Sequence, residues 1–177
     1  MLAELFTPPR VIDNGLLGAL GYLLVIWSLP WIENAGLTPD RWRELGALAA
    51  EAVRGGELWR AVTALTLHGD LGHLVANSAF GVLFGVLAAR MLGSGVAWLL
   101  ILVGGISGNL VNAMVQADGF RSIGASTATF AALALAGAVA WRRGWFRNRD
   151  IRRSAAPVVG GIALLVYTGL GAEGENV

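Results

Sequence analysis

Three polar side chains near the ends of long apolar segments could carry chemistry. Ser126 follows Gly124 by two residues at the start of a run of small and apolar residues, and His73 and Asn77 lie four residues apart at the start of another. Residues four apart share one face of a helix, so His73 and Asn77 are expected to point the same way. A serine hydroxyl beside several hydrogen-bond donors suits acyl transfer, which needs a nucleophile and groups that stabilise an oxyanion.

Each of these residues also has a purely structural interpretation. A serine among alanines and glycines is common packing material in membrane helices, and a His–Asn pair can simply hydrogen-bond two helices together. In favour of chemistry, Ser126 lies near the start of its helix, where the first backbone N–H groups lack partners and the helix dipole favours negative charge. An oxyanion formed at Ser126 could be bound there.

The composition places these residues in a membrane. The 177 residues are 55% hydrophobic and 14% charged, which is more apolar surface than a soluble domain of this length can bury. Each of five apolar segments is near the length that crosses about 30 Å of hydrocarbon as a helix. We therefore predict an all-α polytopic membrane protein, with one domain over residues 1–177 and spans at residues 15–31, 71–92, 96–115, 123–141 and 155–170.

The arginines predict the orientation of the chain, which has no lysine. Residues 141–153 hold six Arg against one Asp, and short cytoplasmic loops carry the positive charge. The N-terminus is then cytoplasmic, and His73, Asn77 and Ser126 share one depth at the outer ends of their spans. Residues 38–54, also outside, are expected to form one amphipathic helix at the membrane surface, capped by Thr38 and stopped by Gly55 and Gly56.

Small residues predict how the spans pack. Gly81, Gly85 and Ala89 continue the face of His73 and Asn77, which predicts a close neighbouring helix, although no obvious partner is evident in the sequence. On the third span, Gly104 and Gly108 share a face with the amides of Asn112 and Gln116, and this face is also expected to pack closely against a neighbouring helix. A channel or transporter would need a polar stripe along a whole span, and none is visible beyond Asn109, Asn112 and Gln116.

Three motifs in this layout resemble the rhomboid family of intramembrane serine proteases: ELWRAVT at residues 57–63, HGDLGHLVAN at 68–77 and GAS at 124–126. The resemblance implies Ser126 as nucleophile, His73 and Asn77 as oxyanion-hole residues, and Gly124 as a small residue that admits the substrate backbone. It implies structural roles for Trp59, Arg60 and His68. His68 matches a family histidine at the membrane edge whose role is less direct, and its alternative interpretation is an interfacial, partly solvated histidine. No cofactor and no metal is implied.

The same resemblance exposes two departures. The family usually has Gly after the serine, and here Thr127 is expected to crowd the approach to the oxyanion. Family members also use a His base on a sixth helix, whereas the two histidines of this chain are His68 and His73. We therefore expect five of six helices, in a chain that stops before its base.

The function implied is a serine endopeptidase that cleaves transmembrane protein substrates in a bacterial inner membrane through an acyl-enzyme, without a nucleic-acid partner. The alternative is an inactive rhomboid-like pseudoprotease that binds transmembrane helices. On either interpretation the 177-residue chain itself is expected to be unreactive, because a serine without a base is a poor nucleophile.

Overall fold

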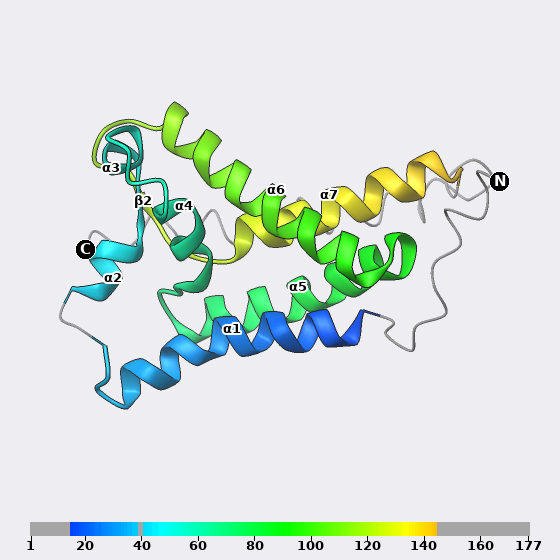
Figure 1. The fold of residues 1–177 in the computed structure, drawn as a ribbon, viewed down its shortest axis with the longest axis horizontal. Helices are drawn as coiled ribbons and strands as arrows, with labels where there is room; N and C mark the ends of the chain where they lie inside the picture. The colour runs from blue at the N-terminus through cyan, green and yellow to red at the C-terminus, as the bar shows by residue number, and fades with distance from the viewer. Residues whose placement is uncertain (1–14, 39–40, 145–177) are drawn as a thin grey trace.

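A computed structural model describes residues 15–38 and 41–144, and four long helices dominate it (Figure 1). They are α1 (Leu16–Asn34), α5 (Leu71–Leu92), α6 (Ser94–Val115) and α7 (Ser126–Arg142). Short elements lie at one end of this bundle: α2 (Trp42–Gly46), β1 (Leu48–Ala49), α3 (Ala50–Arg54), α4 (Arg60–Thr63), the 3₁₀ helix η2 (Ala64–Thr66) and β2 (Arg121–Ser122). The protein is therefore a helical membrane bundle, as predicted, with one two-stranded ladder that was not foreseen.

The long helices occupy the first four predicted spans. By length and composition, α1, α5 and α6 are each able to cross a membrane. The helix of the fourth predicted span begins at Ser126 instead of residue 123, because Gly124 has a φ of 128° that a right-handed helix cannot accommodate. The fifth predicted span, residues 155–170, lies outside the described residues.

The prediction of one helix over residues 38–54 is wrong. Two short helices, α2 and α3, are separated by an extended stretch at Ala47 and Leu48, both buried. Leu48 pairs antiparallel with Ser122 and Ala49 with Arg121. Burial and strand pairing with a distant segment override the local helical pattern here.

The small-residue face of α5 is covered by aromatic side chains. A Cβ added at Gly81 would lie 2.5 Å from the hydroxyl oxygen of Tyr22, and one at Gly85 would lie 2.4 Å from the ring of Trp98. Tyr22 belongs to α1 and Trp98 to α6, and their rings stack with centroids 5.7 Å apart. The face therefore has its neighbours within the described helices, contrary to what the sequence suggested.

Close packing through small residues also joins α6 to α7. A Cβ at Gly104, Gly105 or Gly108 would come within 3 Å of Ala131, Ala128 or Thr127, respectively. The buried amide of α6 is Asn109, whereas Gln116 is exposed and hydrogen-bonds to Asn112 over 3.3 Å. Close packing of the predicted glycine face is confirmed. The buried polar residue of α6 is Asn109, however, and not the expected pair Asn112 and Gln116.

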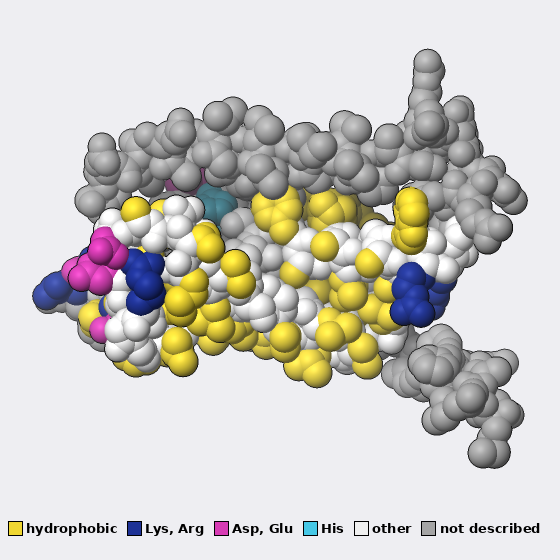
Figure 2. Space-filling model, turned by 90° about the horizontal axis from the view of Figure 1, so that it is seen from above, with side chains coloured by type: hydrophobic (Ala, Val, Ile, Leu, Met, Phe, Trp, Pro, Cys, Tyr) yellow, Lys and Arg dark blue, Asp and Glu magenta, His cyan; other side chains and the backbone are white. Residues whose placement is uncertain are grey.

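Apolar and charged side chains occupy different parts of the surface, as expected for a protein that spans a membrane. Figure 2 shows hydrophobic side chains over the middle of one face, charged side chains of both signs at the end that holds the short elements, and arginine at the opposite end. Lipid-facing surface cannot carry charge cheaply, so the apolar middle is the part that the bilayer covers.

Candidate functional site

The turn before Ser126 is held by two segments that precede α5. The N–H of Gly124 donates to the carbonyl of Ala64 in η2 at 2.9 Å. The N–H of Ala125 makes a long hydrogen bond of 3.5 Å to Nε2 of His68. Ser126 follows as the first residue of α7 and is half-buried. The position of the candidate nucleophile is therefore fixed through the backbone of its neighbours.

His73 and Asn77 face this turn. A Cβ added at Gly124 would lie 2.5 Å from Cε1 of His73 and 3.7 Å from Nδ2 of Asn77. Even alanine at position 124 would collide with the imidazole, so glycine is required here by this contact as well as by its φ of 128°. Gly124, two residues before Ser126, thus lies against His73 and Asn77 at one end of the bundle.

Two residues fix the orientation of the His73 and Asn77 face. Asp70 caps α5 by accepting a hydrogen bond of 2.8 Å from the N–H of His73. Tyr22 of α1 donates a hydrogen bond of 2.8 Å to the backbone carbonyl of Asn77. Both ends of the four-residue segment are therefore held.

The side chain of Asn77 keeps an unused donor. Asn77 is 2% exposed, and its Nδ2 has no hydrogen-bond partner within the described part of the chain. A buried donor without a partner costs about 1–3 kcal/mol, so its presence beside the Gly124 turn needs an explanation. An oxyanion that forms only during a reaction would supply the missing acceptor.

His68 is buried, which contradicts its alternative interpretation as a partly solvated, interfacial histidine. Its side chain is 6% exposed, and its ring lies edge-on to that of His73 with centroids 5.3 Å apart. Burial lowers the pKa of His68 to about 4, and the nearby His73 adds to the effect, while the Thr66 backbone and Asp70 oppose it. A neutral His68 can accept the Ala125 N–H, and a protonated one cannot.

This depressed pKa predicts acid-sensitive folding. The folded protein takes up a proton on His68 near pH 4, whereas the unfolded chain does so near its ordinary value of 6.5. Stability is therefore unaffected above pH 6.5 and is lost as the pH falls from 6.5 to 4, by up to about 3 kcal/mol from this residue. Unfolding in detergent should show a smaller loss between pH 7.5 and 4 for His68→Gln than for the wild type. Equal losses would contradict the buried, neutral His68.

Thr127 was expected to crowd the approach to the oxyanion, but its side chain contacts α6 instead. Its hydroxyl donates to Oδ1 of Asn109 at 2.8 Å, and a Cβ at Gly108 would lie 2.5 Å from its methyl carbon. Both contacts are with α6. The side chain is thus turned toward α6, whereas His73 and Asn77 belong to α5.

The Trp59–Arg60 pair organises the segment between α1 and α5. Arg60 is 8% exposed; its Nε donates to Glu57 at 2.6 Å, and its Nη1 donates to the carbonyls of Glu44 at 2.8 Å and Ala47 at 2.9 Å. Trp59 directs its side chain outward and is 56% exposed. Arg60 thus holds the extended stretch where the expected long helix is interrupted.

Removing this arginine is expected to destabilise the fold. Arg60→Ala leaves the carbonyls of Glu44 and Ala47 without that donor, which should lower the free energy of unfolding by about 1–3 kcal/mol. The matched control is Arg41→Ala, because the exposed Arg41 bonds only to Glu44 in the described residues. Thermal melting in detergent should separate the two variants, and equal midpoints would count against a structural role for Arg60.

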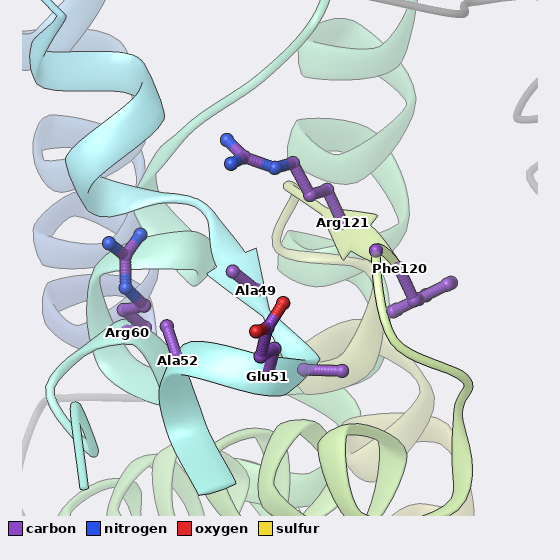
Figure 3. Close-up of a pocket in the computed structure, with 8 residues that line it drawn as sticks. Ala49, Glu51, Ala52, Arg60, Phe120 and Arg121 are labelled. Atoms are coloured by element: carbon purple, nitrogen blue, oxygen red, sulfur yellow. The ribbon is translucent and has the colours of Figure 1, made fainter. Parts of the chain in front are cut away.

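A separate hollow of about 260 Å³ lies between α3 and β2 (Figure 3). Ala49, Glu51, Phe120 and Arg121 border it together with Arg60. Nε and Nη1 of Arg60 already donate to protein acceptors. The described residues hold no group of three or more metal-ligating side chains, here or elsewhere.

Sequence reasoning missed three residues that support the site. Asp70 had a readable signal, because an aspartate just before a long apolar run is a typical helix cap. Asn109 was noticed only as a polar exception in its span. Tyr22 had no signal at all, since its partner Asn77 lies 55 residues away.

Comparison with known proteins identifies the family. The rhomboid domain model matches residues 55–174, which is more than half of the chain. RHOMBOID-like protein 5 of Arabidopsis thaliana is 36% identical over 107 residues, 59% of this chain and 35% of that protein. The putative rhomboid protease YdcA of Bacillus subtilis is 36% identical over 90 residues, 50% of this chain and 45% of that protein. No solved structure matches the chain significantly.

The region matched by the rhomboid domain model contains His68, His73, Asn77, Gly124 and Ser126. Rhomboid-like protease 3 of Toxoplasma gondii is 30% identical over 126 residues, 70% of this chain and 46% of that protein, so this chain spans less than half the length of these three relatives. Several relatives are named as proteases, which supports an intramembrane protease function at the level of the family. With its apolar helices and its match to the rhomboid domain, this integral membrane chain belongs to the rhomboid family.

Proposed function

We propose that the chain is that of an intramembrane serine endopeptidase in which Ser126 is the nucleophile. The observation that carries the proposal is the buried Nδ2 of Asn77, which has no partner among the described residues and lies beside the turn that leads into Ser126. A donor held in a low-dielectric site is worth far more to a developing negative charge than the same donor in water.

The chemistry follows from this placement. Oγ of Ser126 would attack the carbonyl carbon of a peptide bond and give an acyl-enzyme as the C–N bond breaks and the amine leaves with a proton. Water would then hydrolyse the ester and restore the serine. In both steps the carbonyl oxygen becomes negative, and Asn77, His73 and the first N–H groups of α7 are the donors available to it.

The attack by Ser126 also needs a base that accepts the proton of its hydroxyl. In the described structure, Nε2 of His68 accepts the Ala125 N–H, and His73 lies against Gly124 on the oxyanion side. We assign neither histidine as the base; the family resemblance implies another histidine for that role.

A second candidate function rests on this observation. Of the two histidines of the chain, His68 bonds to the Ala125 N–H and His73 lies against Gly124, so neither is assigned as the base. Without a base, the same bundle could bind a transmembrane helix without cutting it. In either case the proposed partner is a transmembrane segment of another protein. The proposed setting is a bacterial inner membrane, with the N-terminus in the cytoplasm and the Ser126 end outside.

One experiment separates cleavage from binding. The complete gene product is reconstituted in liposomes with a single-span membrane protein that carries a different tag at each end. A protease yields two tagged fragments, whereas a pseudoprotease co-purifies with the intact protein. The proposal expects fragments cut within or beside the span, and binding without fragments would favour the second function.

A further inference from the structure

A buried amide links the helix of Ser126 to the segment before α5. Asn109 of α6 is 4% exposed. Its Oδ1 accepts the hydroxyl of Thr127 at 2.8 Å, and its Nδ2 donates to the carbonyl of Ala61 at 2.9 Å. One side chain thereby connects α7, α6 and α4, and Ala61 is the residue next to Arg60.

Every substituent of the Thr127 side chain is engaged. The hydroxyl donates to Asn109. The methyl carbon packs against Gly108, where an added Cβ would lie only 2.5 Å from it. β-branched side chains are stiff at χ1, so two such contacts fix the rotation of residue 127 about the helix axis. Successive residues are about 100° apart around a helix, so the direction of Ser126 is fixed with it.

This first turn needs an external tether. The first N–H groups of a helix lack intrahelical partners, and helix ends fray. Ala125 at the N-cap position makes no side-chain capping bond. The Thr127–Asn109 bond is therefore a side-chain anchor for the turn that carries Ser126, together with the Gly124 and Ala125 backbone bonds.

We propose that Thr127 and Asn109 are positioning residues for Ser126. The inference rests on the proposed function, because the direction of Ser126 matters for activity only if its oxygen reacts. Thr127 is not itself a second nucleophile here, since its hydroxyl proton is directed at the Asn109 oxygen. The pair holds the helix start against α6, while Gly124, two residues before Ser126, lies against His73 and Asn77 of α5.

The pair can be tested without any catalytic activity. The chain has no cysteine, so Ser126→Cys supplies a single thiol whose alkylation by N-ethylmaleimide in detergent reports local opening of the turn. In this background Thr127→Val keeps the shape but loses the hydroxyl, and alkylation should speed up about three- to tenfold, as expected for one lost hydrogen bond. Thr127→Ser retains the hydroxyl and should stay within about twofold of the parent rate.

A matched control excludes general loosening of the helix. Thr129→Val makes the same substitution two residues along α7, where the hydroxyl lies beside Tyr22 of α1 instead of Asn109. It should leave the alkylation rate within about twofold of the parent. An equal rise for Thr129→Val, or no rise for Thr127→Val, would overturn the proposal.

A double substitution tests the coupling itself. Asn109→Leu alone should speed alkylation as Thr127→Val does, and the two together should give no further increase, because either change removes the same bond. Multiplicative effects would overturn the pairing. If Asn109→Leu fails to fold, the comparison of Thr127→Ser with Thr127→Val still decides the matter. Fluorophosphonate reactivity of Ser126 is measured separately, so a failure of the proposed function is distinguished from a failure of the positioning pair.

Discussion

Replacement of Ser126 by alanine is expected to abolish cleavage of a transmembrane substrate by the complete gene product. Without the hydroxyl no acyl-enzyme can form, and loss of a serine nucleophile typically lowers kcat by about 10⁴-fold or more. Binding of the substrate should persist, because the surfaces around the site are unchanged. Fragment release in liposomes measures the first effect, and co-purification of the intact substrate measures the second.

The control for this variant is Ser122→Ala, four residues earlier. Ser122 lies in β2, where it is aligned with Leu48 in the ladder. Its hydroxyl has no role in the proposed reaction, so this variant should cleave at close to the wild-type rate. Cleavage by Ser126→Ala at a similar rate would remove Ser126 from the mechanism.

Asn77→Ala is expected to give the second largest effect. The substitution removes the buried Nδ2 that lies beside the Gly124 turn. Loss of one oxyanion donor typically lowers kcat by about 10²–10³-fold, and KM should change little because the donor acts only on the developing charge. Steady-state kinetics on a detergent-soluble substrate would separate the two constants.

Asn112→Ala provides the matched control for Asn77. It removes an amide from α6 that is hydrogen-bonded to the exposed Gln116. Its kcat should remain within about threefold of the wild type. A rise in KM with unchanged kcat for Asn77→Ala would mean that Asn77 binds substrate and does not stabilise the transition state.

Local spacing was enough to predict that His73, Asn77 and Ser126 lie at the same end of the bundle. His73 and Asn77 are four apart on one helix, and both they and Ser126 lie at the starts of apolar segments that enter the bundle from the same end. Hydropathy predicts the spans. Because successive spans run in opposite directions, the second and fourth spans both start on the same side of the membrane. These features depend only on residues close together in the sequence.

Features that depend on distant contacts were not predictable. Ala47 and Leu48 are extended because Ser122 pairs with Leu48 and Arg60 binds the Ala47 carbonyl, and neither partner is visible in the pattern of residues 38–54. The side of α7 on which Thr127 lies depends on how α7 is rotated against α6. That rotation is set by the glycine contacts of α6 and by Asn109, not by the sequence around Ser126.

The most direct test of the account is the site of reaction with a fluorophosphonate. Mass spectrometry of the complete gene product after labelling should place the adduct on Ser126, and Ser126→Ala should carry none. The 177-residue chain should label far more slowly, because neither His68 nor His73 is assigned as its base. An unmodified Ser126 in the complete product would contradict the protease assignment, and rapid labelling of the 177-residue chain would make one of its two histidines the base.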